Sequence, residues 1–270
     1  MTIEELRKEP HLSASGINDY TDCSLLYKLS RIDKHPPEFT ADSLAFGGTI
    51  HEVNAVFQNY RKDGISFTKE NMLNTFEYYW AAKAKGKDHI RYKGKNTYDS
   101  LLIQGRGFIS LYYDNMQQDA FTVIAVEEPF RFTIEGINVP IIGVIDLIEE
   151  DEAHTIIVSD TKTSKQSFND EKIDKNFQLT LYHMALKANG YKDRDILLKL
   201  DTLIKTKKPR FEPYYTTRTE EDENRAARKI RSVWEEIQKN VFTPNDTSWK
   251  CGGCAYQTYC NEWFNNGGKE

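Results

Sequence analysis

The hydrophobic and polar positions of this 270-residue chain divide it into a helical first part and a mixed second part. Up to about residue 120, apolar residues recur every three or four positions, which is typical of helices. We expect a first helix over residues 12–23, with Ser13 or Ser15 as its N-cap, and a second helix that opens at Gly47-Gly48-Thr49. Residues from about 68 to 115 are expected to be mostly helical.

After about residue 121 the spacing shortens toward that of strands, and predicted strands and helices then alternate. No internal repeat and no low-complexity linker divides the chain, so we favour a single domain with a helical insertion. Strands are expected over residues 123–126, 130–134, 139–148, 156–162 and 196–204, and helices over 172–189 and 219–239, the last opened by the capping box Thr219-x-x-Asp222.

Two of these apolar segments carry the residues with the clearest chemistry. Asp146 interrupts one, Asp160 interrupts the other, and Lys162 follows two residues later. The polar stretch 149–154 between them is typical of a hairpin turn, so the two aspartates should lie opposite each other, about 5 Å apart. Such carboxylates can bind one hard cation beside the ammonium of Lys162, a site suited to hydrolysing a phosphodiester. The alternative is two solvated acids flanking a hairpin.

Composition and charge set modest bounds. Hydrophobic content of 39% and charged content of 29% are ordinary for a soluble protein. No stretch approaches the roughly 18 apolar residues that span a bilayer, and the charged N-terminus lacks the apolar centre of a signal peptide, so we expect a cytoplasmic protein without membrane contact. A net charge of −5 gives no hint of nucleic-acid binding, although it can hide local patches. One basic turn, either solvated or in contact with phosphate, contains Lys205, Lys207, Lys208 and Arg210.

All four cysteines fit one pattern. Cys251, Cys254 and Cys260 form C-x2-C-x5-C near the C-terminus, and Cys23 stands alone near the other end. In a cytosolic protein this spacing favours a metal over disulfides. Four thiolates could hold zinc or an iron–sulfur cluster, and the lone distant cysteine slightly favours the cluster because zinc sites usually recruit two C-x2-C pairs. The alternative is four unrelated thiols.

The motifs, taken in order, resemble a known family. It is the RecB-like branch of the PD-(D/E)XK nucleases, and the similarity is greatest to its iron–sulfur members, the AddB nuclease domain and the small CRISPR-adaptation nucleases. Ser24 departs from the pattern, because these proteins often have proline after the first cysteine. The motifs are Leu12-Ser13-Ala14-Ser15 with Tyr20 and Cys23, Gly48-Thr49-Ile50-His51-Glu52, Gly143-Val144-Ile145-Asp146, Asp160-Thr161-Lys162-Thr163, Gln178-Leu179-x-x-Tyr182, and the C-terminal cysteines.

The resemblance implies a role for each matching residue. Asp146, Asp160, His51 and the carbonyl of Thr161 would hold Mg²⁺ or Mn²⁺, and Lys162 would orient the attacking water and stabilise charge at phosphorus. The four cysteines would bind a [4Fe–4S] cluster that joins residues 1–30 to 240–270. Without the family, His51 is only a residue beside an apolar stripe. Gln178 and Tyr182 would position the substrate or Lys162, and Glu128 is a weaker candidate.

The fold implied is an α/β PD-(D/E)XK core, a central mixed sheet flanked by helices, at about 121–210, with a helical region at about 31–120 and the C-terminal iron–sulfur clamp. The function implied is a metal-dependent DNA exonuclease acting on single strands or ends, in repair, recombination or the processing of CRISPR or phage DNA. One alternative is a subunit active only within a helicase or integrase complex. The chain has no G-x4-G-K-[ST] phosphate loop, so a partner would supply unwinding. Another alternative is a non-catalytic nucleic-acid-binding module.

Overall fold

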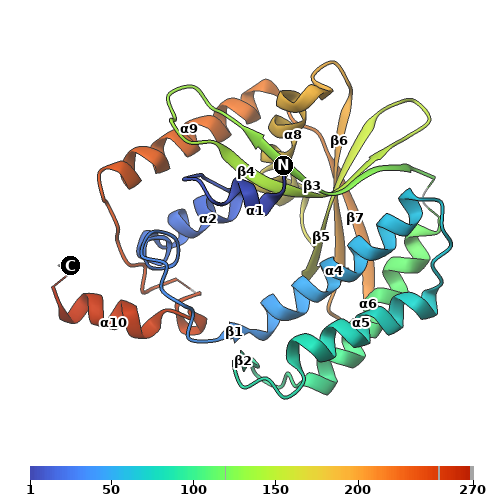
Figure 1. The fold of residues 1–270 in the computed structure, drawn as a ribbon, viewed down its shortest axis with the longest axis horizontal. Coiled ribbons are helices and arrows are strands. Elements are labelled where there is room, and N and C mark those ends of the chain that lie inside the picture. The colour runs from blue at the N-terminus through green and yellow to red at the C-terminus, as the bar shows by residue number, and fades with distance from the viewer. Residues whose placement is uncertain (119, 249, 268–270) are drawn as a thin grey trace.

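The chain is built around one twisted five-stranded sheet (Figure 1). We describe it from a computed structural model, which covers residues 1–118, 120–248 and 250–267. The strand order is β3-β4-β5-β6-β7; β5 and β6 are parallel and the other neighbours are antiparallel. The strands are β3 (Thr122–Phe132), β4 (Ile141–Glu150), β5 (Ile156–Ser164), β6 (Ile196–Ile204) and β7 (Arg210–Thr216).

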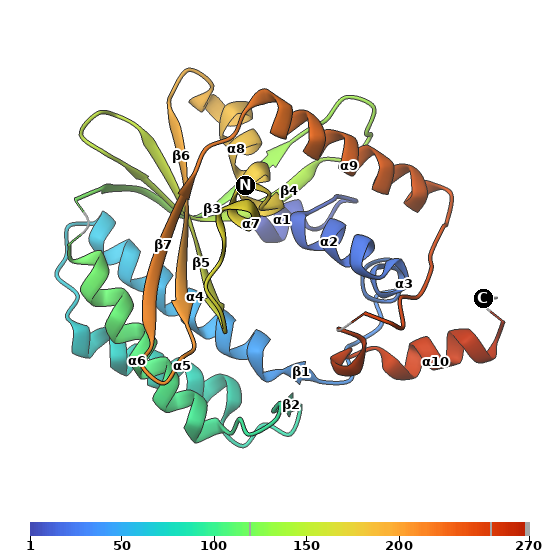
Figure 2. The same cartoon turned by 180° about the vertical axis from the view of Figure 1, so that it is seen from behind.

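Helices cover the sheet in two groups, each with its own apolar core (Figures 1 and 2). One group belongs to the expected helical region and packs around Phe46, Trp80 and Phe108. The other group packs with apolar residues of the sheet around Ile17, Leu179 and Ile230. The first group is α4 (Asp42–Lys62), α5 (Lys69–Ala84) and α6 (Tyr98–Met116), and the second is α2 (Ala14–Asp22), α8 (Phe177–Leu186) and α9 (Glu220–Gln238).

The N-terminal part of the chain lies beside its C-terminal part. The hydroxyl of Tyr20 donates to the carbonyl of Val241 at 2.6 Å, and Asn245 donates to the carbonyl of Asp22 at 2.7 Å. These two hydrogen bonds hold the two parts side by side. The short elements are α1 (Ile3–Leu6), α3 (Ser24–Tyr27), β1 (Thr40–Ala41) parallel to β2 (Ile90–Arg91), α7 (Asp170–Asp174) and α10 (Gln257–Asn265), with π-helical turns at Lys28–Ile32 and Lys187–Tyr191 and a 3₁₀ turn at Cys251–Gly253.

The expected α/β fold, with a central mixed sheet flanked by helices, is confirmed, but the expected bounds of several helices and strands were wrong. The expected helix at 172–189 is two helices, α7 and α8, because Asn176 leaves the helical conformation and caps α8 with its side chain. The two short strands expected between 123 and 134 are one strand, β3. Strand β7 was missed. The start of α4 also differs: it begins at Asp42, so Gly47 lies inside it.

Asp42 explains the early start of α4. Its carboxylate is buried, and it accepts bonds from the Ser43 amide, the Lys93 amide and the side chain of Asn96. The helix therefore begins where tertiary contacts fix its first residue, before the glycines that sequence spacing suggested. In the described part of the chain, no helix has the length and apolar character needed to cross a membrane.

A buried histidine between α8 and α9 predicts acid sensitivity. The Nδ1 atom of His183 lies 2.8 Å from the Glu223 carboxylate, but burial lowers the pKa of His183 below its ordinary 6.5. The unfolded chain therefore takes up this proton more readily than the folded protein. The contribution of neutral His183 to the free energy of unfolding is therefore present above the pKa of the unfolded chain, and it is lost as the pH falls below about 6.5.

We predict that the melting temperature of the wild-type protein falls more steeply on acidification than that of His183→Gln. Thermal unfolding followed by circular dichroism between about pH 5 and pH 8 measures the difference, in the range where histidine titrates. Parallel curves for the two proteins would contradict the prediction.

Candidate active site

Three carboxylates lie in a row across three adjacent strands. The register of β4 and β5 pairs Leu147 with Ser159, and its next step places Asp146 opposite Asp160, as the hairpin predicted. The pairs on either side of Glu127 in β3 place that residue opposite Asp146. Glu127 has a left-handed backbone, with φ of +52°, which is uncommon outside glycine. The order β3-β4-β5 thus crowds three acids onto one line.

Two basic side chains, His51 and Lys162, approach this row. The Nδ1 atom of His51, on α4, lies 2.9 Å from Oδ2 of Asp146, and the ammonium of Lys162 donates to Oδ1 of Asp160 at 2.9 Å. The amide of Thr161 donates to Oδ2 of Asp146 at 3.3 Å. Because the amide and carbonyl of one strand residue point to the same side, the carbonyl of Thr161 also faces β4. The structure therefore brings His51, Asp146, Asp160, Thr161 and Lys162 together.

The charges of the site shift several pKa values. Burial raises the pKa of Asp160, and Lys162 offsets only part of this. Burial acts in the same direction on Asp146, but the hydrogen bond and charge of His51 outweigh it and lower the pKa of Asp146. Burial would lower the pKa of His51 and of Lys162, yet the neighbouring carboxylates raise both. The neighbouring carboxylates therefore favour the protonated forms of His51 and Lys162.

Glu127 is the site residue that sequence reasoning missed. Burial and the charge of Asp146 raise the pKa of Glu127 to about 7, although part of the residue is exposed to solvent. The sequence favoured its neighbour Glu128, which pairs with Ile145 instead. An acid followed by a second acid gives no signal of which one faces the row, because that depends on the register of β3 with β4.

The donor atoms suit a hard cation in their chemistry. Asp160 is only 1% exposed, and its Oδ2 atom has no hydrogen-bond partner. Such an orphaned buried oxygen is costly unless something pairs with it. Within the described residues, no three His, Cys, Asp or Glu side chains are already arranged as a metal site. His51 is bonded to Asp146 and Lys162 to Asp160, so these groups satisfy one another in part.

Gln178 and Tyr182 lie beside the row on α8. The side-chain amide of Gln178 donates to the Tyr182 hydroxyl at 2.7 Å, and burial followed by the charges of Asp146 and Asp160 raises the pKa of Tyr182. The Tyr182 ring packs edge-to-face with Phe130, at 6.0 Å between centroids. Phe130 in turn lies over Gly143, three residues before Asp146. The pair is therefore part of the wall of the site.

The four cysteines line one cavity of about 740 Å³. Burial raises the pKa of Cys254 and of Cys260, and the neighbouring thiols add to the effect. Their segment is also held by the chain before β1. The Thr258 amide donates to Glu38 Oε1 at 2.8 Å, and the rings of His35 and Tyr259 stack at 4.3 Å. The donor set, four thiols, suits a soft metal or a cluster.

The basic turn is only partly available for phosphate. The ammonium of Lys205 folds over the Phe46 ring at 4.8 Å, and burial lowers its pKa. Arg210 is paired with Glu212 at 2.9 Å. Lys207 and Lys208 are exposed. The structure therefore separates the four predicted residues into two exposed lysines, a packed one and an ion-paired arginine.

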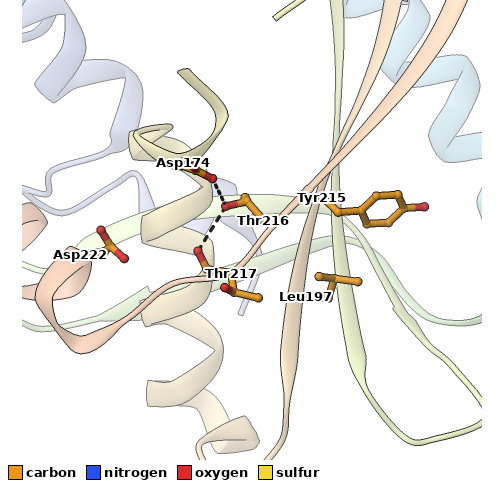
Figure 3. Close-up of a pocket in the computed structure, with 6 residues that line it drawn as sticks. All are labelled: Asp174, Leu197, Tyr215, Thr216, Thr217 and Asp222. Carbon is orange, nitrogen blue, oxygen red and sulfur yellow. Dashed lines mark hydrogen bonds between the residues drawn. The ribbon is translucent and has the colours of Figure 1, made fainter. Parts of the chain in front are cut away.

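A second hollow lies at the outer strand β7 (Figure 3). It has a volume of about 540 Å³ and is open to solvent. The Thr216 hydroxyl donates to Asp174 at 2.8 Å there. None of the predicted site residues lines it, so it does not contribute to the candidate active site. Its lining residues are Asp174, Leu197, Tyr215, Thr216, Thr217 and Asp222.

Comparison with known proteins agrees with this geometry. The model of the PD-(D/E)XK nuclease superfamily matches residues 11–261. A crystal structure described as "Putative exonuclease" from Eubacterium rectale superposes with a TM-score of 0.56 and 13% identity, covering 94% of this chain and 92% of that one. The structure of SSO0001 gives a TM-score of 0.38 and 17% identity, covering 88% and 95%. No curated protein matches the chain.

We predict that Gly143→Ala disturbs the wall of the site. An added Cβ would lie 2.6 Å from Cζ of Phe130, so the ring must shift and its edge-to-face contact with Tyr182 must change. Overpacking of this kind costs about 1–3 kcal/mol of unfolding free energy. Urea denaturation measures it. Adding Phe130→Leu should recover part of the loss, and a double variant less stable than Gly143→Ala alone would contradict this explanation.

Proposed function

Because the chain belongs to the PD-(D/E)XK nuclease superfamily, we propose that it is a metal-dependent deoxyribonuclease acting as an exonuclease on single strands or DNA ends. The observation that carries the proposal is the row of Glu127, Asp146 and Asp160 with Lys162 beside it. Three acids crowded beside a protonated lysine suit a cation and a phosphodiester. The fold shared with an exonuclease-described protein supports the exonuclease form of the proposal.

Asp146, Asp160, His51 and the Thr161 carbonyl are the residues that would hold Mg²⁺ or Mn²⁺. When bound, the cation supplies Lewis-acid activation and neutralises charge at the phosphate. The buried Oδ2 of Asp160, which has no hydrogen-bond partner among the described residues, would gain a partner in the cation. His51 would have to release its proton first, because a metal ligand is the neutral imidazole.

The protonation states assign roles to the remaining groups. The pKa of Lys162 is raised, so its ammonium stays charged and stabilises negative charge at phosphorus instead of taking a proton. Glu127, with a pKa of about 7, can exchange a proton with the attacking water near neutral pH. The Gln178 amide donates a hydrogen bond to the Tyr182 hydroxyl, and this pair forms one wall of the space beside Asp146 and Asp160.

We further propose that the four cysteines hold a [4Fe–4S] cluster whose role is structural. They come from both ends of the chain and line one cavity, and no histidine is among the described residues that line it. The exposed Lys207 and Lys208 would contact the DNA backbone. Because the chain contains no phosphate loop, unwinding of duplex DNA would come from a partner, such as a helicase or an integrase complex.

The test of catalysis uses 5′- and 3′-labelled single-stranded and duplex DNA with Mg²⁺, Mn²⁺ or EDTA. We predict that Asp146→Asn, Asp160→Asn and Lys162→Ala each lower the cleavage rate by about 10²–10⁴-fold, the usual worth of a positioned catalytic group. His51→Ala should raise the Mn²⁺ requirement more mildly. Glu152→Ala, which removes an acid from the turn of the same hairpin, is the control and should cleave at the wild-type rate.

Wild-type activity retained by Lys162→Ala would refute the assignment of the site. Wild-type protein that cleaves none of these DNAs with either metal would refute the proposed function itself.

For the cluster, we predict that anaerobically purified protein is brown and contains iron and sulfide. Cys23→Ser should bleach it and lower its melting temperature, because a metal that closes so long a loop stabilises the fold. Ser24→Ala is the matched control: it removes the hydroxyl that donates to the Thr243 carbonyl at 3.2 Å, but no thiol. It should lose some stability and keep its colour. Colourless, zinc-loaded, fully active protein would overturn the iron–sulfur assignment.

A further inference from the structure

Two consecutive glycines inside α4 have no packing reason to be there. Glycine in the interior of a helix is destabilising relative to alanine. A Cβ added at Gly47 would meet no atom within 4 Å, and one added at Gly48 would meet only the Lys83 ammonium, at 3.6 Å. By contrast, a Cβ at Gly105 of α6 would collide with Phe76 at 1.9 Å. Gly105 is thus explained by helix packing, and Gly47 and Gly48 are not.

The two glycines lie on the face of α4 that carries His51. Residues three, four and seven positions apart share a helix face, so Leu44, Gly47, Gly48 and His51 follow one another along it. Leu44 is 71% exposed and lines the cysteine cavity. His51, at the other end of this face, contacts Asp146 at 2.9 Å. The face therefore runs from the cysteine cavity to the carboxylate row, and Figure 2 shows α4 leading from β1 toward the sheet.

Cations border both parts of this face. Arg91 and Lys93 line the cavity, where the Arg91 guanidinium stacks on the Phe39 ring at 3.5 Å. The buried carboxylate of Asp42 holds the Lys93 amide at 3.0 Å, which fixes this basic loop on the first turn of α4. Lys83 lies over Gly48, where its ammonium is ion-paired with Glu52 of α4 at 2.6 Å. At the far end, the orphaned oxygen of Asp160, 1% exposed, marks the point where a ligand is needed.

We propose that this face of α4 is the floor of a path along which one DNA strand runs from the cysteine cavity to the carboxylates. Gly47 and Gly48 leave room for the sugar–phosphate backbone to approach the helix closely, and Arg91 and Lys93 contact its phosphates. The path rests on the proposed function for its choice of DNA. It makes the two glycines determinants of substrate binding, at the expense of helix stability.

The test measures strand binding apart from cleavage. A fluorescein-labelled oligothymidylate is titrated with the full-length protein in EDTA, and binding is followed by fluorescence anisotropy. We expect Gly47→Ala to raise the melting temperature yet weaken binding, and Gly47→Leu to weaken it by roughly tenfold, which is a tenfold rise in Kd. Asn74→Ala and Asn74→Leu, at an exposed position of α5, are the matched controls and should bind as the wild type does.

Opposite movement of stability and affinity separates this role from a structural one, because a glycine needed for packing would lose both. Lys93→Ala provides a second measurement: it should lower the slope of log K against log salt by about 0.7, the value for one phosphate contact with a single strand. Unchanged affinity in both Gly47 variants would overturn the path. Wild-type protein that binds the strand but never cleaves DNA would refute the nuclease proposal and leave the path standing.

Discussion

The crowding of Glu127, Asp146 and Asp160 on one line across the sheet is the constraint on which the site depends. Burial is the larger cause of the raised pKa values of Glu127 and Asp160, and the neighbouring charge of Asp146 adds to it, because like charges this close disfavour ionisation. Only rigid strand pairing can hold them there, and the pairing of β4 with β3 and β5 supplies it; the register shift between β3 and β4 lies at Val123 and Ala125, before Glu127. Lys162 and His51 relieve part of the repulsion, and a divalent cation would relieve more.

The position of α4 follows from the same requirement, because His51 must reach Asp146 from another layer. At the far end of α4, Arg61 pairs with the fully buried Glu149 of β4 at 3.1 Å and bonds to Gln58 at 2.7 Å. A buried ion pair contributes little net stability, but it fixes orientation, since removing one partner leaves the other charge uncompensated. Asp42 fixes the opposite end. We infer that contacts at both ends fix the orientation of α4, and that His51 lies between these two fixed ends.

The sequence could predict the features that local interactions determine, but not those that depend on tertiary contacts. The hairpin register of Asp146 and Asp160 was predictable because a short polar turn joins their strands, and the helix start at Thr219 because the capping box is local. Glu127 was not, because residues 133–140 form an irregular connection that does not fix the register of β3. The start of α4 depends on bonds from Lys93 and Asn96, some fifty residues away. The resemblance alone supplied His51.

The cysteine cavity and the face of α4 share a wall, so the cavity and the helix affect each other's stability. The cavity is lined by Cys23, by the C-terminal cysteines, and also by Asp42 and Leu44 of α4 with the loop of Lys93. A cluster bound there would tie the chain ends to each other directly beside the first turn of α4, the helix that carries His51. Loss of the cluster would then loosen the first turn of α4, which positions His51. Activity would fall although no cysteine contacts the carboxylates. A structural cofactor can in this way govern catalysis through the geometry of a single helix.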